Sequence, residues 1–179
     1  MSKATKAQPK AATLGAYRVR RFGDPALKGR CPEVTSFDER LVALAEAMFR
    51  IMDEEDGVGL AAPQIGIQKR LAVWCHPETG ERYVLVNPRF VEMSESTTVE
   101  AEGCLSVPGY AVDIPRADRV VVECENVEGT TTRVELEGLL ARIVQHETDH
   151  LDGVLILDRT TPEERRRVLK EMREQALTQ

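Results

Sequence analysis

The chain has 179 residues, a length typical of one domain. Hydrophobic residues make up 42% of it, which is enough for a packed core and excludes a wholly disordered protein. The formal net charge of −6 disfavours general binding to DNA or to an anionic membrane, although a local basic patch remains compatible with it.

The N-terminal segment is expected to be a disordered tail. Residues 1–13 contain few large apolar groups, and residues 14–179 are expected to form a single domain. The segment has lysines but no continuous apolar run, so it lacks the pattern of a signal peptide. Elsewhere no stretch approaches the roughly 18 apolar residues that a membrane span needs. We therefore expect a cytoplasmic protein.

The first predicted helix begins at the capping box SFDE, with Ser36 as N-cap and Glu39 three residues later. Apolar residues then recur at helical spacing until the acidic run DEEDG, which ends at Gly57. The following segment, GVGLAAPQIG, is rich in glycine and small residues, and it is predicted to be a structured loop.

The middle of the chain is predicted to form antiparallel strands. Short turns at PETGE and VEGT favour hairpins, which pair neighbouring strands in opposite directions. The predicted strands are LAVWCH at 71–76, RYVLVNP at 82–88, RFVEM at 89–93, RVVVECEN at 119–126 and TTRVELEG at 131–138.

Helices are predicted again towards the end of the chain. One covers about 137–151, with Gly153 as its C′ residue. The last begins with Thr161 as N-cap, Pro162 at N1 and Glu164 at N3. The fold class is therefore α+β, with antiparallel strands around a central helix and further helices at both ends.

The central predicted helix carries the motif QHETDH. His146 and His150 are four residues apart, so they lie on one helical face and point the same way. That face continues the row through Leu139 and Ile143, which directs both histidines inward. A surface helix with two ordinary histidines is the alternative. Buried paired histidines favour a shared metal ion, with Glu147 beside it.

A third metal ligand is needed. Metallopeptidases of the zincin type take it from downstream, but no histidine follows His150, and Glu163 lies in the opening turn of the next helix. His76 is expected to be exposed beside a turn. Cys104 in EGCLSVP remains as the third ligand. Three protein ligands leave one coordination position open, as in catalytic metal sites.

An open position on the metal predicts hydrolysis. A metal lowers the pKa of a bound water from about 15.7 towards 7. Glu147 projects about 100° around the helix from His146, so it is expected to reach the water rather than the metal. It could take the proton of the water and deliver it to a leaving amine. Attack on an amide carbonyl then creates an oxyanion, which needs hydrogen-bond donors.

Three segments together resemble the motifs of the peptide deformylase family. Their order and separations also match that family, and the resemblance extends from about Tyr17 to Leu157. The segments are GVGLAAPQ at 57–64, EGCLS at 102–106 and QHETDH at 145–150. The resemblance implies one catalytic domain over 14–179. It implies one divalent metal ion per chain, Fe²⁺ foremost, with Zn²⁺, Ni²⁺ or Co²⁺ as replacements.

The resemblance also assigns residue roles. It implies Cys104, His146 and His150 as ligands, and Gln64 and the Leu105 N–H as oxyanion donors. Gln64 could instead be an amide that stabilises its loop. Glu102 is expected to pair with Arg116 and brace the metal loop, and Glu147 is the expected general acid and base.

The implied substrate is the N-formylmethionyl end of a nascent polypeptide, which yields formate and a free amino terminus. Loop 57–60 and strand 105–108 are expected to receive the peptide by β-addition. Ala111 and Asp113 lie where some members of the family carry a basic residue. The resemblance therefore does not predict which substrate residues are preferred beyond the first. Candidates for the methionine pocket are Val58, Gly59, Leu139, Ile143 and His146; the apolar members could equally be core.

Two other functions are weighed against this one. A zincin-like metallopeptidase lacks its downstream ligand here, and a non-catalytic metal-binding module would not need Glu147 or Gln64. The expected enzyme is a monomer that binds neither DNA nor membrane. The final predicted helix gathers five basic residues, so it could contact ribosomal RNA, although nearby glutamates and apolar residues also fit simple packing.

Overall fold

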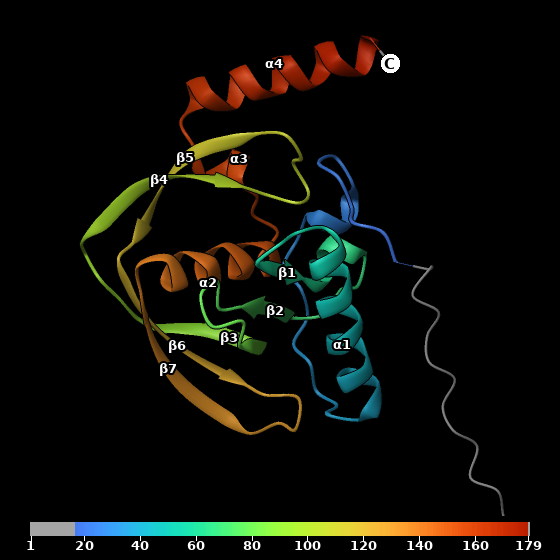
Figure 1. Cartoon of the computed structure of the whole chain (residues 1–179), viewed down its shortest axis with the longest axis vertical. Coiled ribbons are helices and arrows are strands. Elements are labelled where there is room, and N and C mark those ends of the chain that lie inside the picture. Colours follow the sequence, from blue (N-terminus) through green and yellow to red (C-terminus); the bar gives the residue numbers. More distant parts are fainter. Residues whose placement is uncertain (1–16, 179) are drawn as a thin grey trace, which may run out of the picture.

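A computed structural model describes residues 17–178 and contains two antiparallel sheets with helices around them (Figure 1). The larger sheet has five strands in the order β1-β2-β3-β6-β7, and β4 pairs only with β5. The strands are β1 Gly59–Ala61, β2 Leu71–Cys75, β3 Arg82–Met93, β4 Thr97–Gly103, β5 Ala111–Ala117, β6 Arg119–Glu125 and β7 Thr131–Glu137. The predicted α+β class is confirmed.

The α-helices are α1 Glu39–Glu54, α2 Gly138–Leu151, α3 Ile156–Arg159 and α4 Pro162–Thr178. Two 3₁₀ segments, η2 Pro25–Leu27 and η3 Ala62–Ile65, complete the regular elements of residues 17–178. None of these described helices has the length and apolar character needed to cross a bilayer. The expected tail, residues 1–13, lies outside the described part of the chain.

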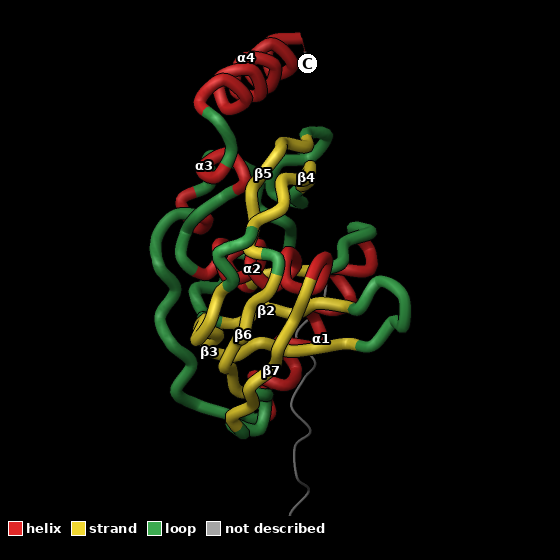
Figure 2. The backbone as a smooth tube through the Cα atoms, turned by 90° about the vertical axis from the view of Figure 1, so that its left-hand side faces the viewer, coloured by secondary structure: helices red, strands yellow, loops and turns green. Residues whose placement is uncertain are grey.

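Helix α2 is the central element. Its apolar side, with Ala141, Val144 and Leu151, joins a buried cluster that includes residues of β2 and β6. Figure 2 shows the larger sheet on one side of α2 and the β4–β5 pair on the other. The helix ends at Leu151 with Asp152 as C-cap, and Gly153 follows at φ +74, the left-handed conformation predicted for its C′ residue. The opposite side of α2 is therefore free to face the segment between β4 and β5.

The first helix begins two residues later than predicted. Asp38, not Ser36, is the N-cap, and its carboxylate accepts hydrogen bonds from the N–H groups of Arg40 and Leu41. A carboxylate at this position also interacts favourably with the helix dipole. On the other side of the core, Thr161 caps α4 as predicted, because its hydroxyl accepts from the Glu164 N–H at 3.2 Å.

The prediction of an irregular loop at 57–66 was wrong. Residues Gly59–Ala61 form β1, which pairs antiparallel with Trp74–Ala72, and η3 follows directly. RFVEM is also not a separate strand, because it continues β3 through Asn87 at φ +51. A register shift against β6 between Val86 and Arg89 absorbs the irregularity.

The pair β4–β5 was not predicted, and it changes the setting of Cys104. The residues from 104 to 110 connect these two strands and contain turns. The predicted strand at 105–108 is therefore wrong. The Val107 N–H donates to the Cys104 carbonyl at 2.8 Å, which closes the chain into a turn there. The turn that connects these two paired strands places Cys104 against the side of α2 that carries the histidines.

Candidate metal centre

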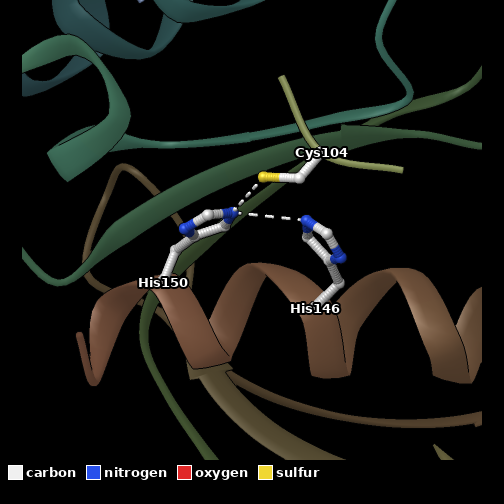
Figure 3. Close-up of side chains that lie close together, drawn as sticks. All are labelled: Cys104, His146 and His150. Atoms are coloured by element: carbon white, nitrogen blue, oxygen red, sulfur yellow. Dashed lines mark hydrogen bonds between the residues drawn. The ribbon is translucent and has the colours of Figure 1, made fainter. Parts of the chain in front are cut away.

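Cys104, His146 and His150 converge on one point. Cys104 Sγ lies 3.3 Å from His150 Nε2, which in turn lies 3.2 Å from His146 Nε2 (Figure 3). All three ligand atoms lie within 4.8 Å of one another. Cys104 comes from the turn after β4, and both histidines come from α2, as predicted.

These spacings fit a divalent metal ion. Metal–nitrogen bonds of about 2.1 Å and metal–sulfur bonds of about 2.3 Å at tetrahedral angles separate the ligand atoms by roughly 3.4–3.6 Å. The three atoms are all possible metal ligands and lie within 4.8 Å of one another. One soft thiolate and two imidazoles form a donor set suited to iron, zinc, nickel and cobalt. The chain therefore has a metal site of three protein ligands.

A buried carboxylate orients the first histidine. Glu102 is 6% exposed, and its Oε2 accepts a hydrogen bond of 2.9 Å from His146 Nδ1. Arg116 donates to both Glu102 oxygens at 2.9 Å, which confirms the predicted Glu102–Arg116 pair. With Nδ1 held in this way, His146 presents Nε2 to the metal position.

Two further charged groups of this network were missed from the sequence. Arg142 donates to Glu102 at 2.7 Å, and Asp149 accepts from Arg116 at 2.5 Å. Arg142 lies on α2 just before the motif and Asp149 lies within it, and charged residues on a helix are ordinarily expected to face solvent. The signal available was their spacing, since Arg142 precedes His146 by four residues and so shares its face.

The network shifts the ionisation of its members. Burial disfavours the charged form of Glu102, but hydrogen bonds from Arg116 and His146 outweigh burial and hold its pKa well below the usual range. Burial also disfavours charge on His146, yet contacts with Cys104 and Glu102 raise its pKa to about 10. Burial and the neighbouring His146 lower the pKa of His150. The centre thus favours one positive charge, which a proton or a metal ion can supply.

Glu147 lies beside the centre without touching a partner. It is 4% exposed, and its Oε2 is buried with no hydrogen-bond partner among residues 17–178. Burial raises its pKa to about 7. Gly59 of β1 makes room for this side chain, since a Cβ there would lie 2.7 Å from the Glu147 carboxyl carbon. A buried carboxylate in this position is available to a reacting molecule.

The amide of Gln64 points towards the same place. Its oxygen accepts from the Ala61 N–H at 2.8 Å, which fixes the orientation of the amide. Its nitrogen lies 3.3 Å from Ser106 Oγ and 3.8 Å from Cys104 Sγ. Gln64 therefore both stabilises its own segment and aims a neutral donor at the metal centre.

Leu105 follows the cysteine ligand in the turn. None of the hydrogen bonds found among residues 17–178 uses its N–H. Its carbonyl accepts from Arg21 at 2.5 Å, which holds the turn from the outside. The peptide group between Cys104 and Leu105 is fixed from its other end, because the Cys104 carbonyl accepts from the Val107 N–H at 2.8 Å.

A cavity of about 720 Å³ opens at the centre. This volume lies within the range of small-molecule and peptide-side-chain sites. Val58 and Leu139 are 47% and 54% exposed at the cavity, whereas Ile143 is 5% exposed and buried. The cavity brings together all of the predicted site residues except the buried ligand His150: Val58, Gly59, Gln64, Cys104, Leu105, Leu139, Ile143, His146 and Glu147.

Comparison with known proteins agrees with this arrangement. The family model described as polypeptide deformylase matches residues 16–166. A peptide deformylase of Thermotoga maritima is 45% identical over 163 residues, which cover 90% of this chain and 98% of the relative. Peptide deformylase 1 of Corynebacterium glutamicum is 42% identical over 165 residues, covering 91% and 98%.

The fold agrees as well. The crystal structure of peptide deformylase from Thermus thermophilus superposes with a TM-score of 0.84 at 40% identity, over 90% of this chain and 96% of that one. The family match and the convergence of a thiolate with two imidazoles lead to one conclusion. The chain belongs to the peptide deformylase family, the metal-dependent amidohydrolases that remove an N-formyl group.

Proposed function

We propose that the protein removes the formyl group from the N-formylmethionyl end of newly made polypeptides and releases formate. The observation that carries this proposal is a buried, unpartnered carboxylate, Glu147, beside a three-ligand metal centre at the bottom of a cavity. A structural metal site would be closed by a fourth protein ligand and would need no such carboxylate.

Cys104, His146 and His150 would hold one divalent ion, which we infer to be Fe²⁺ in the cell. The donor set supports iron but equally accepts Zn²⁺, Ni²⁺ or Co²⁺, so cellular supply decides which is bound. When bound, the metal acts as a Lewis acid that lowers the pKa of water and polarises the formyl carbonyl. The hydrogen bond from His146 to Glu102 fixes the ligand before any metal arrives.

Glu147 is the proposed general base and acid. Its free Oε2 takes a proton from the attacking water and then delivers that proton to the departing amine. Gly59 leaves the carboxylate close to β1 with no room to swing in that direction. This restraint supports proton transfer along one path.

The Gln64 amide and the Leu105 N–H are the proposed donors to the oxyanion. Both are neutral, and both are fixed by neighbouring bonds before the reaction begins, so they need no reorganisation. The two donors come from different parts of the chain, one from η3 and one from the turn after β4. A carbonyl held between them would lie at the metal position.

The substrate chain is proposed to extend along β1, with its first side chain in the cavity. Among residues 17–178, β1 pairs only with β2, so its other edge is proposed to accept an extended peptide. Gly59, Leu139, Ile143 and the more exposed Val58 offer apolar contacts to a methionine side chain.

Release of formate tests the proposed function. The metal-loaded protein is expected to release one formate per formyl-Met-Ala-Ser peptide and to leave the peptide bonds intact. Internal cleavage without formate would favour a zincin-like metallopeptidase. Metal binding without either product would favour a non-catalytic module.

Replacing Gln64 with leucine is expected to lower the catalytic rate about 10²- to 10³-fold, the usual effect of one lost oxyanion donor. The loss should appear mainly in kcat, because the donor acts on charge that develops in the transition state. Gln68→Leu is the matched control, since Gln68 is exposed and bonds to the Ala26 carbonyl away from the cavity. A Gln64→Leu enzyme that changes only in KM would make this residue a support of its loop.

We further propose that α4 contacts the ribosome. The helix carries five basic residues, Arg165, Arg166, Arg167, Lys170 and Arg173, of which all but the last make ion pairs with acidic neighbours among the described residues. Packing is the competing role, because Val168 is fully buried and Leu169 and Met172 lie against the same cluster.

Binding to purified ribosomes is therefore expected to weaken as salt rises. Truncation after Pro162 should abolish it while activity on short formyl peptides survives. The pair Lys170→Glu and Arg173→Glu changes charge but leaves the apolar side of the helix intact. Undiminished ribosome binding by both folded variants would leave α4 as a packing element.

The remaining expectations are part of the same proposal. We infer a cytoplasmic monomer whose residues 14–179 form one catalytic domain and which binds neither DNA nor membrane. The formal net charge of −6 supports this choice of partners. Sedimentation at working concentration would test the oligomeric state.

A further inference from the structure

Arg142 is a buried cation that lines the cavity. It is 7% exposed and lies one helical turn before His146 on α2. Its Nη1 donates to Glu102 at 2.7 Å and to the Ile114 carbonyl at 3.0 Å, and its Nη2 donates to the Thr98 carbonyl at 2.7 Å. These bonds join α2 to both β4 and β5.

Glu102 is the point where this cation meets the metal ligand. Its Oε1 accepts from Arg116 and from Arg142, while its Oε2 accepts from Arg116 and from His146. A carboxylate has about four acceptor sites, so all of them are used. Loss of Arg142 would remove one of these four bonds and leave Oε1 with Arg116 alone, which weakens the hold on the carboxylate that orients His146.

The two arginines on Glu102 differ in their surroundings. Arg116 turns towards Asp149 and does not line the cavity. Arg142 lines the cavity together with Leu139 and Ile143, the proposed contacts of the first substrate side chain. Of the two arginines, Arg142 therefore lines the pocket as well as bonding to the carboxylate behind the metal ligand, and Glu102 itself also lines the cavity.

We propose that Arg142 is a positioning residue that couples filling of the first-residue pocket to the orientation of His146. The proposal rests on the proposed function for the identity of the pocket. A side chain in the pocket would cover the small part of Arg142 that is still exposed, and charge-assisted bonds strengthen as the local dielectric falls. A firmly held Glu102 then fixes the imidazole ligand, so a filled pocket raises kcat as well as improving binding.

Metal binding gives the first test, with Co²⁺ alone as the probe and its absorption bands as the readout. Arg142→Leu is expected to weaken Co²⁺ binding about 10- to 100-fold, the usual cost of losing a group behind a metal ligand. The Co²⁺ affinity of Arg142→Lys should lie between those of the wild type and Arg142→Leu. A lysine keeps the charge, but its ammonium lacks the planar fork that reaches Glu102 and Thr98 together. Arg70→Leu is the matched control, because Arg70 is 5% exposed and bonds to Pro88 and Asp152 outside the cavity.

Steady-state kinetics on fully metal-loaded enzyme gives the second test. The ratio of kcat for formyl-Met to formyl-Ala peptides is expected to fall at least about fivefold towards one in Arg142→Leu, and to stay unchanged in Arg70→Leu. Circular dichroism identifies the folded variants, and Arg142→Lys serves if Arg142→Leu does not fold. Unchanged Co²⁺ affinity or an unchanged kcat ratio would overturn the proposal. Absence of formate from the wild-type protein would instead overturn the proposed function. The Co²⁺ titration would still test whether Arg142 supports the metal site, because it does not depend on activity.

Discussion

Replacing Cys104 with alanine is expected to leave the purified protein with well under one metal ion per chain and to abolish formate release. The metal site found among residues 17–178 has three ligand residues, and Cys104 is one of them. Without it two imidazoles remain, and these alone hold a divalent ion weakly. Because a Lewis acid supplies several kcal/mol of transition-state stabilisation, the rate should fall on the order of 10³-fold or more.

Metal content after dialysis is the decisive measurement for Cys104→Ala. Cys124→Ala provides the control, because Cys124 is also a buried free cysteine but contacts Thr132 in the sheet, away from the cavity. It should retain one ion per chain. A dialysed Cys104→Ala protein with a full complement of metal would show that another group is the third ligand.

Replacing Glu147 with glutamine is expected to lower kcat by roughly 10²- to 10⁴-fold while metal binding is retained. Glutamine keeps the size of the side chain beside Gly59 but cannot take and return a proton. The effect should be similar in Glu147→Ala, because the chemistry rather than the packing is lost.

Formate release and metal content must be measured on the same preparation of Glu147→Gln. Glu46→Gln on the exposed side of α1 is the matched control and should behave as the wild type. A loss below about tenfold at full metal content would exclude Glu147 from proton transfer, since a general acid–base group contributes more than that.

The metal ligands and the central helix could be predicted because they follow local rules. The apolar residues of α2 recur at the helical period, and His146 and His150 share one face by spacing alone. Cys104 could be predicted because few other groups were available. Each of these inferences needs only neighbours in the sequence or a short process of elimination.

The strands β4 and β5 could not be predicted in the same way. In β4 only Glu102 is buried, so the strand has no apolar alternation, and β5 contains Pro115, which ordinarily argues against a strand. These two strands pair only with each other in the described structure, where β5 packs against α2 and α3 and the Thr98 carbonyl of β4 accepts from Arg142 of α2. Three-residue β1 exists as a strand only because β2 lies next to it.

The burial of charged side chains was also not predicted from the sequence. A charged residue in a helix is expected at the surface, and only the fold shows that Arg142 meets Glu102 and the carbonyls of β4 and β5. The same holds for Asp149, whose partners Arg116 and Arg159 come from β5 and α3. Such pairs are set by tertiary geometry, which local sequence patterns do not reveal.

Gly59 limits how this enzyme could acquire drug resistance. A larger side chain on a strand could push off an inhibitor that pairs with that strand. At Gly59 even a methyl group would collide with Glu147, at 2.7 Å from its carboxyl carbon, before it reached a ligand in the cavity. Selection would therefore favour changes at the exposed Val58 or Leu139, and an inhibitor that binds mainly to the backbone of β1 would leave the cell few ways to escape.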